Sequence, residues 1–260
     1  YHHFSIVMHA TRRMPWLSAG NVDYRALSRD ERSRGDFGKD QWVLDERMES
    51  RYQIPKGFYD RWRRLDYGHL VRREDNCWGA SADEIEFANA DTFHMTNCTP
   101  QHEAFNRDAF QFSGLWGQLE NLVSRQATKD SKLSRLCIFS GPVFTARKDL
   151  KIDDEEVGKV YVPLSFWKVI VAPKRRGGVG AYGFIVSQSQ ELQDDPPFVE
   201  DFSPGALEAH QVSLAAIESK TAVRFGSALK AVDALKTHPE HTESIALHSP
   251  ADLWFGPPGA

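Results

Sequence analysis

The sequence predicts an α+β fold in which a central antiparallel sheet is flanked by helices. Short segments rich in aromatic and β-branched residues, which favour strands, span residues 136–139, 160–162, 166–171 and 182–186. The segment 109–127 differs, because its apolar residues recur every three or four positions, the period of a helix with one buried face. Together these segments predict the α+β class.

The N-terminal part predicts a hairpin followed by a long loop. Residues 4–9 and 17–22 are expected to form two short strands, separated by the basic, turn-prone segment 10–15. Residues 25–60 are polar, and their glycine and proline residues interrupt any period, so we expect a surface loop. A loop of this length usually has a function.

The remaining elements are short. An extended stretch at 61–71 contains Asp66-Tyr67-Gly68-His69, and 93–96 is a further strand candidate, so candidate catalytic residues lie near strand ends. Helical patterns return at 213–218 and 226–235. The proline-containing tail from residue 238 onward is expected to be irregular.

Length and composition indicate an ordinary globular protein. The 260 residues are 41% hydrophobic and 26% charged, which allows a substantial core and excludes disordered and collagen-like classes. We find no low-complexity divider and no internal repeat, so we expect one domain over residues 1–260. Because the sequence starts without Met and soon enters a strand, we expect it to be a processed product or part of a longer polypeptide.

Charge, cysteine content and hydropathy bear on the cellular location and on the binding partners that we expect. No apolar run approaches the roughly 20 residues of a membrane span, and the first residues lack the pattern of a signal peptide. The three cysteines are odd in number and widely spaced, which favours a reducing compartment over a disulfide framework. These features favour the bacterial cytoplasm over secretion. The net charge of −4 does not by itself indicate a nucleic-acid binder, so the distribution of charge must decide.

The residues that suggest chemistry lie between positions 66 and 120. They are, in order, Asp66-Tyr67-Gly68-His69, Asn97-Cys98-Thr99-Pro100-Gln101, Asn106 and Leu119-Glu120. Each is a weak signal alone, since one histidine among ten is more often structural or exposed than catalytic. Asn beside Thr-Pro is likewise commonest in turns. Their order and spacing, however, favour a functional set.

This set resembles the DNA/RNA nonspecific endonuclease family of the ββα-metal nucleases, which includes the Serratia nuclease and endonuclease G. The Asp-Arg-Gly-His signature of the family aligns with residues 66–69, its Asn-x-x-Pro-Gln with 97–101, and its metal-binding Asn with Asn106. Further similar segments are 4–8, 19–23, 141–144 and 166–169, so the resemblance covers most of the chain.

The resemblance implies a ββα-metal finger as the active site. His69 would be the general base that takes a proton from the attacking water, a task that needs a neutral imidazole. Asn106 would offer its carbonyl oxygen to one Mg²⁺, with Mn²⁺ as an alternative, since Mg²⁺ keeps several waters and needs few protein ligands. Asp66 and Tyr67 complete the catalytic signature, and Glu120 would orient the hydration shell of the ion.

The sequence departs from the family pattern in three ways. Tyr67 stands where the signature has Arg, which removes a positive charge while keeping a hydrogen-bond donor. The spacing from Asn106 to Glu120 is longer than in the Serratia enzyme, so an exposed helix Glu is an equal alternative for Glu120. A second phosphate-neutralising Arg has only Lys39 and Arg47 as nearby candidates.

Binding of a nucleic-acid substrate requires cations along the path of its phosphate backbone. Basic clusters occur at Arg12-Arg13, Arg61-x-Arg63-Arg64, Arg72-Arg73 and Lys174-Arg175-Arg176. We expect Arg63, Arg64, Arg72 and Arg73, which flank His69, to bind substrate together with Asn97 and Gln101. The last cluster is expected to be ordinary surface charge. Phosphate contacts carry no base information, so the predicted substrates are DNA and RNA without sequence preference.

Two other classes of function stay open. His94, Cys98 and His102, spaced by four, are candidates for a zinc hydrolase, although no paired zinc motif supports them. A catalytically weakened nucleic-acid-binding domain would account for the change at Tyr67. The glycine run 177–180 predicts a hairpin turn rather than a phosphate loop. A homodimer and a fused or associated regulatory domain are further partners that the sequence leaves open, and no membrane partner is expected.

Overall fold

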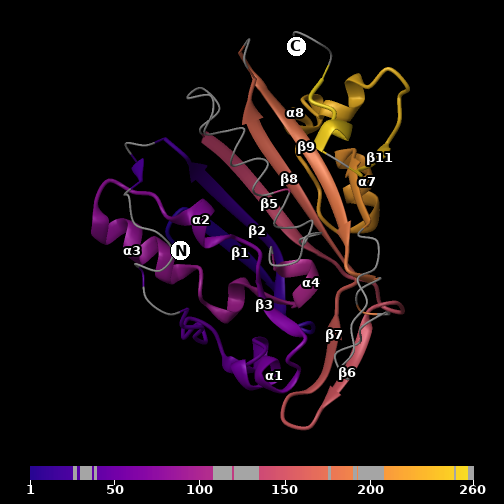
Figure 1. Ribbon diagram of the computed structural model, residues 1–260. Coiled ribbons are helices and arrows are strands. Elements are labelled where there is room, and N and C mark those ends of the chain that lie inside the picture. Colours follow the sequence, from indigo (N-terminus) through magenta and orange to yellow (C-terminus); the bar gives the residue numbers. More distant parts are fainter. Residues whose placement is uncertain are drawn as a thin grey trace.

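The computed structural model describes residues 1–25, 28, 29, 37, 40–107, 119, 135–174, 177–189, 192, 208–248 and 250–256. Within these residues the central element is a seven-stranded sheet of order β1-β2-β5-β8-β9-β10-β11 (Figure 1). The strands are β1 (Phe4–His9), β2 (Met14–Asp23), β5 (Arg135–Val143), β8 (Ser165–Pro173), β9 (Val179–Ser187), β10 (Glu208–Val212) and β11 (Ser244–Ala246). Every neighbouring pair is antiparallel, so the predicted fold class is confirmed.

The N-terminal hairpin forms as predicted, although β2 begins earlier than expected. Val7 lies opposite Leu17, whereas the next residue, Met8, lies opposite Pro15, so Trp16 is the extra residue of a bulge. Proline lacks the N–H that a strand ladder needs, and a bulge is one of the few places in a sheet where it is tolerated. The strand can therefore run through Pro15.

The two faces of the sheet bury different cores. On one face Ile138, Phe166 and Phe184 pack with Leu70 and Phe105. On the other face Trp167 and Val169 pack against Leu214 and Ile217 of α7 (Leu214–Lys220), which lies beside β9 in Figure 1. Alternate residues of β8 thus face opposite sides, as strand geometry requires.

Two short ladders lie outside the main sheet. β3 (Leu65–His69) pairs with β4 (Cys98–His102), and β6 (Leu150–Asp154) pairs with β7 (Gly158–Val162). Side-chain bonds connect the first ladder to the main sheet. Ser140 Oγ on β5 donates to the Leu70 carbonyl at 3.1 Å, and Gln188, after β9, accepts from the His102 amide at 2.7 Å.

The helices within the described residues are short and cover the sheet unevenly. In Figure 1, α1, α2 and α3 gather at the end of the molecule where β1 and β2 lie, whereas α7 and α8 lie beyond β9. The helices are α1 (Lys56–Arg61), α2 (Arg73–Asn76), α3 (Ala82–Asp91), α4 (Glu103–Asn106), α7 and α8 (Ser227–Ala231), with 3-10 turns η3 (Ser50–Tyr52), η4 (Met95–Asn97), η6 (Ala234–Thr237) and η7 (Pro250–Asp252). No helix in the described part of the chain is long and apolar enough to cross a membrane.

Several local predictions need correction. Residues 93–96 do not form a strand: Phe93 and Met95 are buried in the core, and the chain turns through η4 before β4 begins at Cys98. The predicted loop 25–60 ends in α1, for which Pro55 is the N-cap residue. The tail after residue 238 contributes β11 to the sheet. The predicted helix 109–127 lies outside the described residues except for Leu119, which is helical and buried.

Candidate active site

The candidate active site is the unit formed by β3, β4 and α4. His69 is the last residue of β3 and lies opposite Cys98, the first residue of β4. The chain passes from β4 directly into α4, whose first turn is capped by His102, because Nδ1 of His102 accepts from the Ala104 amide at 3.2 Å. Asn106 is the last residue of α4. The sequence therefore folds into a ββα unit that carries both His69 and Asn106.

Asp66 connects the helix end to β3. Its carboxylate accepts a hydrogen bond of 3.0 Å from Nδ2 of Asn106, and Arg107 binds the same carboxylate through Nε and Nη2 at 2.9 and 2.6 Å. The bond uses the amide nitrogen of Asn106, so its carbonyl oxygen is the atom available to a cation. Arg107 was not singled out from the sequence, because a lone Arg after Asn106 carries no distinctive signal.

Aromatic rings surround His69. The indole of Trp42, from the loop before α1, lies with its ring centroid 4.5 Å from the imidazole, and Phe93 meets the imidazole edge-on at 5.2 Å. Trp42 also stacks on Tyr67 at 5.4 Å. Sequence patterns did not identify Trp42, since it lies in a polar segment with no period.

Tyr67, which replaces the signature Arg, turns its hydroxyl toward α1. The hydroxyl donates to Asp60 Oδ1 at 3.0 Å, and the ring stacks on Tyr59 at 4.5 Å. Burial, followed by this hydrogen bond to Asp60, raises the pKa of Tyr67 above its ordinary value. Tyr67 is therefore a neutral donor near pH 7 whose hydroxyl is already bonded to protein.

Asn97 and Gln101 are buried supports of the hairpin. Asn97 is 0% exposed; its Nδ2 donates to the carbonyls of Val71 and Thr92 at 2.9 and 3.0 Å, and its Oδ1 accepts from the Val71 amide. Gln101 is equally buried and donates to Thr99 at 3.1 Å. Both were expected to bind substrate, and this geometry favours a positioning role instead.

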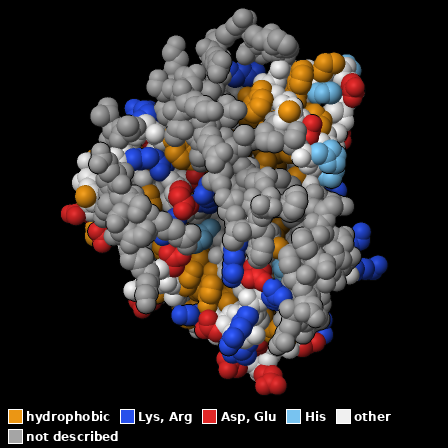
Figure 2. Space-filling model, in the orientation of Figure 1, with side chains coloured by type: hydrophobic (Ala, Val, Ile, Leu, Met, Phe, Trp, Pro, Cys, Tyr) orange, Lys and Arg blue, Asp and Glu red, His pale blue; other side chains and the backbone are white. Residues whose placement is uncertain are grey.

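Three of the four arginines of the expected substrate-binding set have acidic neighbours. Arg64 pairs with Glu103, Arg72 with Glu74 at 3.3 Å and the buried Arg73 with Asp40 at 3.1 Å. Arg63 is exposed and has no acidic partner among the described residues. Figure 2 shows basic and acidic side chains beside one another on the face of the molecule that it draws. Arg63 is thus the arginine of the expected substrate-binding set whose guanidinium has no acidic neighbour among the described residues.

The other basic candidates are bonded to carboxylates or backbone carbonyls of the protein, or lie outside the residues that the structure describes. Arg12 binds Asp149 at 2.7 Å, Arg13 donates to the carbonyls of Val157 and Lys159, and Arg47 binds Asp45 at 2.8 Å. Glu120, Lys39, Arg175 and Arg176 lie outside the described residues.

The donor set fits a hard cation better than zinc. The carbonyl oxygen of Asn106 is the kind of ligand that Mg²⁺ takes while keeping several waters. Among the described residues no three His, Cys, Asp or Glu side chains gather around a common point. Cys98 and His102 lie at opposite ends of a strand, about 13 Å apart at four residues of extended backbone, so spacing by four separates them. Burial also raises the pKa of the Cys98 thiol, which disfavours the thiolate that zinc binds. The described residues therefore do not support the zinc alternative.

The fold has a solved counterpart. The crystal structure of the EndoG/EndoGI complex, which describes the mechanism of EndoG inhibition, matches with a TM-score of 0.60 and 19% sequence identity. The match covers 86% of this chain and 83% of that chain. At this identity the likeness establishes the fold.

Sequence comparison identifies relatives and a family. Protein y4fB of Sinorhizobium fredii is 34% identical over 251 residues, which cover 90% of this chain and 34% of that protein. A protein of Nostoc sp. named Nuclease is 33% identical over 166 residues, which cover 62% of this chain and 50% of that protein. The chain thus spans half or less of the length of these curated relatives. The profile of the DNA/RNA non-specific endonuclease family matches residues 1–232. Because this match covers most of the 260 residues, the chain belongs to the DNA/RNA non-specific endonuclease family.

Proposed function

We propose that the chain is an Mg²⁺-dependent endonuclease that hydrolyses phosphodiester bonds of DNA and RNA without sequence preference. His69 is the general base and Asn106 is the metal ligand. The observation that carries the proposal is the hydrogen bond from Asn106 Nδ2 to Asp66, because it orients the Asn106 amide from the same strand that ends in His69. Family membership and the Nostoc relative named Nuclease support the same chemistry.

In the proposed reaction His69 removes a proton from a water molecule. The oxygen of that water attacks phosphorus, the bond from phosphorus to the 3′ oxygen breaks, and the leaving oxygen takes up a proton from solvent. A general base of this kind contributes about 10²–10⁴-fold to the rate. Asp66 acts as a positioning residue, since it accepts from the Asn106 amide and from Arg107.

The carbonyl oxygen of Asn106 would hold the metal ion. When bound, Mg²⁺ or Mn²⁺ supplies positive charge that stabilises the developing negative charge on phosphate and on the leaving oxygen. Glu120 is retained as the proposed residue that orients the hydration shell. Arg63 contributes contact with the phosphate backbone, as do Arg64, Arg72 and Arg73 to the extent that substrate displaces their acidic neighbours.

The proposal is tested by cleavage of plasmid DNA and of RNA by purified protein with Mg²⁺. His69→Ala is expected to lower kcat by about 10²–10⁴-fold, with unchanged far-UV circular dichroism. The matched control is His248→Ala, because His248 is exposed and lies in the C-terminal segment. Full activity of His69→Ala on both substrates would overturn the assignment.

The metal ligand is tested by paramagnetic broadening. Mn²⁺ bound at Asn106 is expected to broaden the imidazole resonances of His69 in ¹³C-histidine-labelled protein, with His69→Gln supplying the assignment. Asn106→Ala should abolish this broadening at the same Mn²⁺ concentration. Equal broadening in both proteins would remove Asn106 from the proposed site.

A catalytically weakened nucleic-acid-binding domain is the second candidate. The observation that favours it is Tyr67, whose hydroxyl is bonded to Asp60 where the family signature has a cation. Protein that shifts DNA and RNA on a native gel with Mg²⁺ yet leaves both intact would establish this candidate. A homodimer, an associated regulatory domain and a single domain over residues 1–260 remain predictions; light scattering of the purified protein tests the first.

A further inference from the structure

Trp42 lies in a loop that precedes the ββα unit in the sequence, yet its side chain contacts His69. Trp42 contacts the imidazole with a tilt of 50° between the ring planes, and Phe93 meets it at 80°. Trp42 and Phe93 also contact each other edge-to-face at 5.4 Å. The imidazole therefore lies in a corner of two mutually packed aromatic rings, and the flat ring has little room to turn about its soft second side-chain torsion.

The backbone of this loop is fixed next to Trp42. Val43 forms a parallel bridge with His94: its amide donates to the Phe93 carbonyl at 3.0 Å, and its carbonyl accepts from the Met95 amide at 2.8 Å. Val43, which follows Trp42, is thus hydrogen-bonded to the segment that contains Phe93. The Val43–His94 bridge therefore holds both aromatic rings in place relative to each other.

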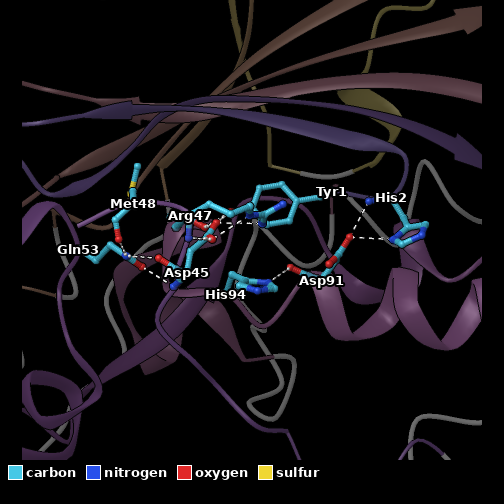
Figure 3. Close-up of polar contacts among 9 residues, drawn as sticks. Tyr1, His2, Asp45, Arg47, Met48, Gln53, Asp91 and His94 are labelled. Atoms are coloured by element: carbon cyan, nitrogen blue, oxygen red, sulfur yellow. Dashed lines mark hydrogen bonds and ion pairs between the residues drawn. The ribbon is translucent and has the colours of Figure 1, made fainter. Parts of the chain in front are cut away.

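Asp45, three residues after Trp42, holds the same loop through further hydrogen bonds (Figure 3). This buried carboxylate accepts from the Arg47 guanidinium at 2.8 and 2.9 Å and from the Tyr1 hydroxyl. The Asp45 backbone is held as well, since its amide donates to Gln53 Oε1 and its carbonyl accepts from Gln53 Nε2, both at 2.8 Å. These buried hydrogen bonds hold the loop in a defined conformation, unlike a loop whose polar groups are bonded mainly to solvent.

We propose that Trp42 is a positioning residue for His69, held in place by the Val43–His94 bridge and the Asp45 network. The proposal rests on the proposed role of His69 as general base. Its physical basis is the steep dependence of proton transfer on geometry, since a misplacement of about 1 Å can cost on the order of a hundredfold in rate. Trp42 touches the base and has no reacting atom of its own.

The kinetic test compares variants of Trp42 with a matched control. Trp42→Ala is expected to lower kcat by about ten- to a hundredfold with KM within about twofold of wild type. Trp42→Phe, which keeps an aromatic wall, should recover most of the loss. The matched control is Trp78→Ala, because Trp78 stacks on a different histidine, His3, at 3.5 Å. If Trp42→Ala does not fold, Trp42→Leu keeps apolar volume and carries the same expectation.

A spectroscopic readout separates positioning from general stability. The ring current of Trp42 should displace the ¹H resonances of His69, so Trp42→Ala should move them and Trp78→Ala should leave them unchanged. A raised KM with unchanged kcat would show that Trp42 binds substrate, as aromatic platforms for nucleobases do, and would overturn the proposal. Unchanged kinetics with an inactive His69→Ala would overturn the role of Trp42 alone, whereas an active His69→Ala would overturn both proposals.

Discussion

Gly68 separates Tyr67 from His69 and lies across the ladder from Thr99. A Cβ atom added at Gly68 would overlap the side chain of Gln101, whose amide is held by Thr99 in the buried interior of the hairpin. The requirement for glycine here is therefore steric, because the backbone of β3 passes directly over Gln101. The Gln101 side chain thus packs directly against the backbone of the strand that carries His69.

Gly68→Ala is expected to destabilise the fold by about 1–3 kcal/mol, since either Gln101 or β3 must shift to accept the methyl group. Urea denaturation measures the loss of stability, and the cleavage assay measures the accompanying loss of activity. Gly226→Ala is the control, because a Cβ at Gly226 meets nothing within 4 Å. Wild-type stability and activity of Gly68→Ala would contradict the steric account.

At this scale the sequence predicted the residues whose order along the chain is distinctive. His69, Asp66 and Asn106 are predicted site residues because a short signature and a fixed spacing mark them, and the ββα unit carries all three. Trp42 could not be predicted, since its contact with His69 arises from a loop held by backbone bonds to residues 93 and 95. The burial of Asn97 was also not predictable, because an amide that binds backbone and one that binds substrate look the same in a sequence.

Among the elements, the β6–β7 ladder and α1 are joined by one buried carboxylate. Asp154, at the end of β6, accepts from Arg61 on α1 at 2.9 and 2.7 Å, from the Trp62 indole at 2.9 Å and from the backbone amides of Glu156 and Val157. The hydrogen bonds from Arg61 are the main cause that lowers the pKa of Asp154 well below its ordinary range.

This depressed pKa predicts a pH-dependent contribution to stability. A carboxyl group whose pKa is lower in the folded state than in the unfolded state stabilises the fold above the unfolded value, about pH 4, and that contribution is lost as pH falls toward the folded value. Asp154→Asn should therefore lower the free energy of unfolding at pH 7 by about 1–2 kcal/mol. The deficit relative to wild type should shrink by pH 3.

Urea denaturation at pH 7 and pH 3 measures this effect. Asp153→Asn is the neighbouring control, because the Asp153 side chain is 62% exposed and, among the described residues, its ion pair is with the exposed Lys151. A constant difference between wild type and Asp154→Asn at both pH values would contradict the electrostatic origin.

The way in which each element is stabilised explains whether the sequence could predict it. β1, β5, β8 and β9 have apolar or β-branched faces that the sheet buries, and all four were predicted. η4 was mistaken for a strand, because a buried apolar pair such as Phe93 and Met95 fits a strand and a tight turn equally well. The short β11 has only three residues, and its pairing with β10 depends on tertiary contacts that local patterns do not report.

For the whole molecule, the net charge of −4 requires that any attraction for nucleic acid be local. The acidic partners of Arg64, Arg72 and Arg73 reduce the cationic field around the ββα unit. We therefore expect modest affinity carried by a small number of phosphate contacts, with a correspondingly shallow dependence on salt concentration.

Arg63→Ala tests this expectation. The logarithm of the association constant for duplex DNA, measured in Ca²⁺ to prevent turnover, should fall linearly with the logarithm of salt concentration. Removing one phosphate contact should reduce that slope by about one. Lys236→Ala, which changes an exposed cation on η6, serves as the control. An unchanged slope in Arg63→Ala would exclude Arg63 from the phosphate contacts.

The β3–β4 ladder is joined to the main sheet through side chains such as Ser140 and Gln188, and it shares no strand with that sheet. A local opening of this ladder would break its own backbone pairing and these side-chain bonds, and would leave the hydrogen bonds between β5 and β8 intact. Backbone amides of β3 can thus exchange with solvent deuterium through a cheaper fluctuation than those of β8. If β3 and β4 form the proposed active site, the segment that would meet a polymer substrate is therefore one that can open without disrupting the central sheet.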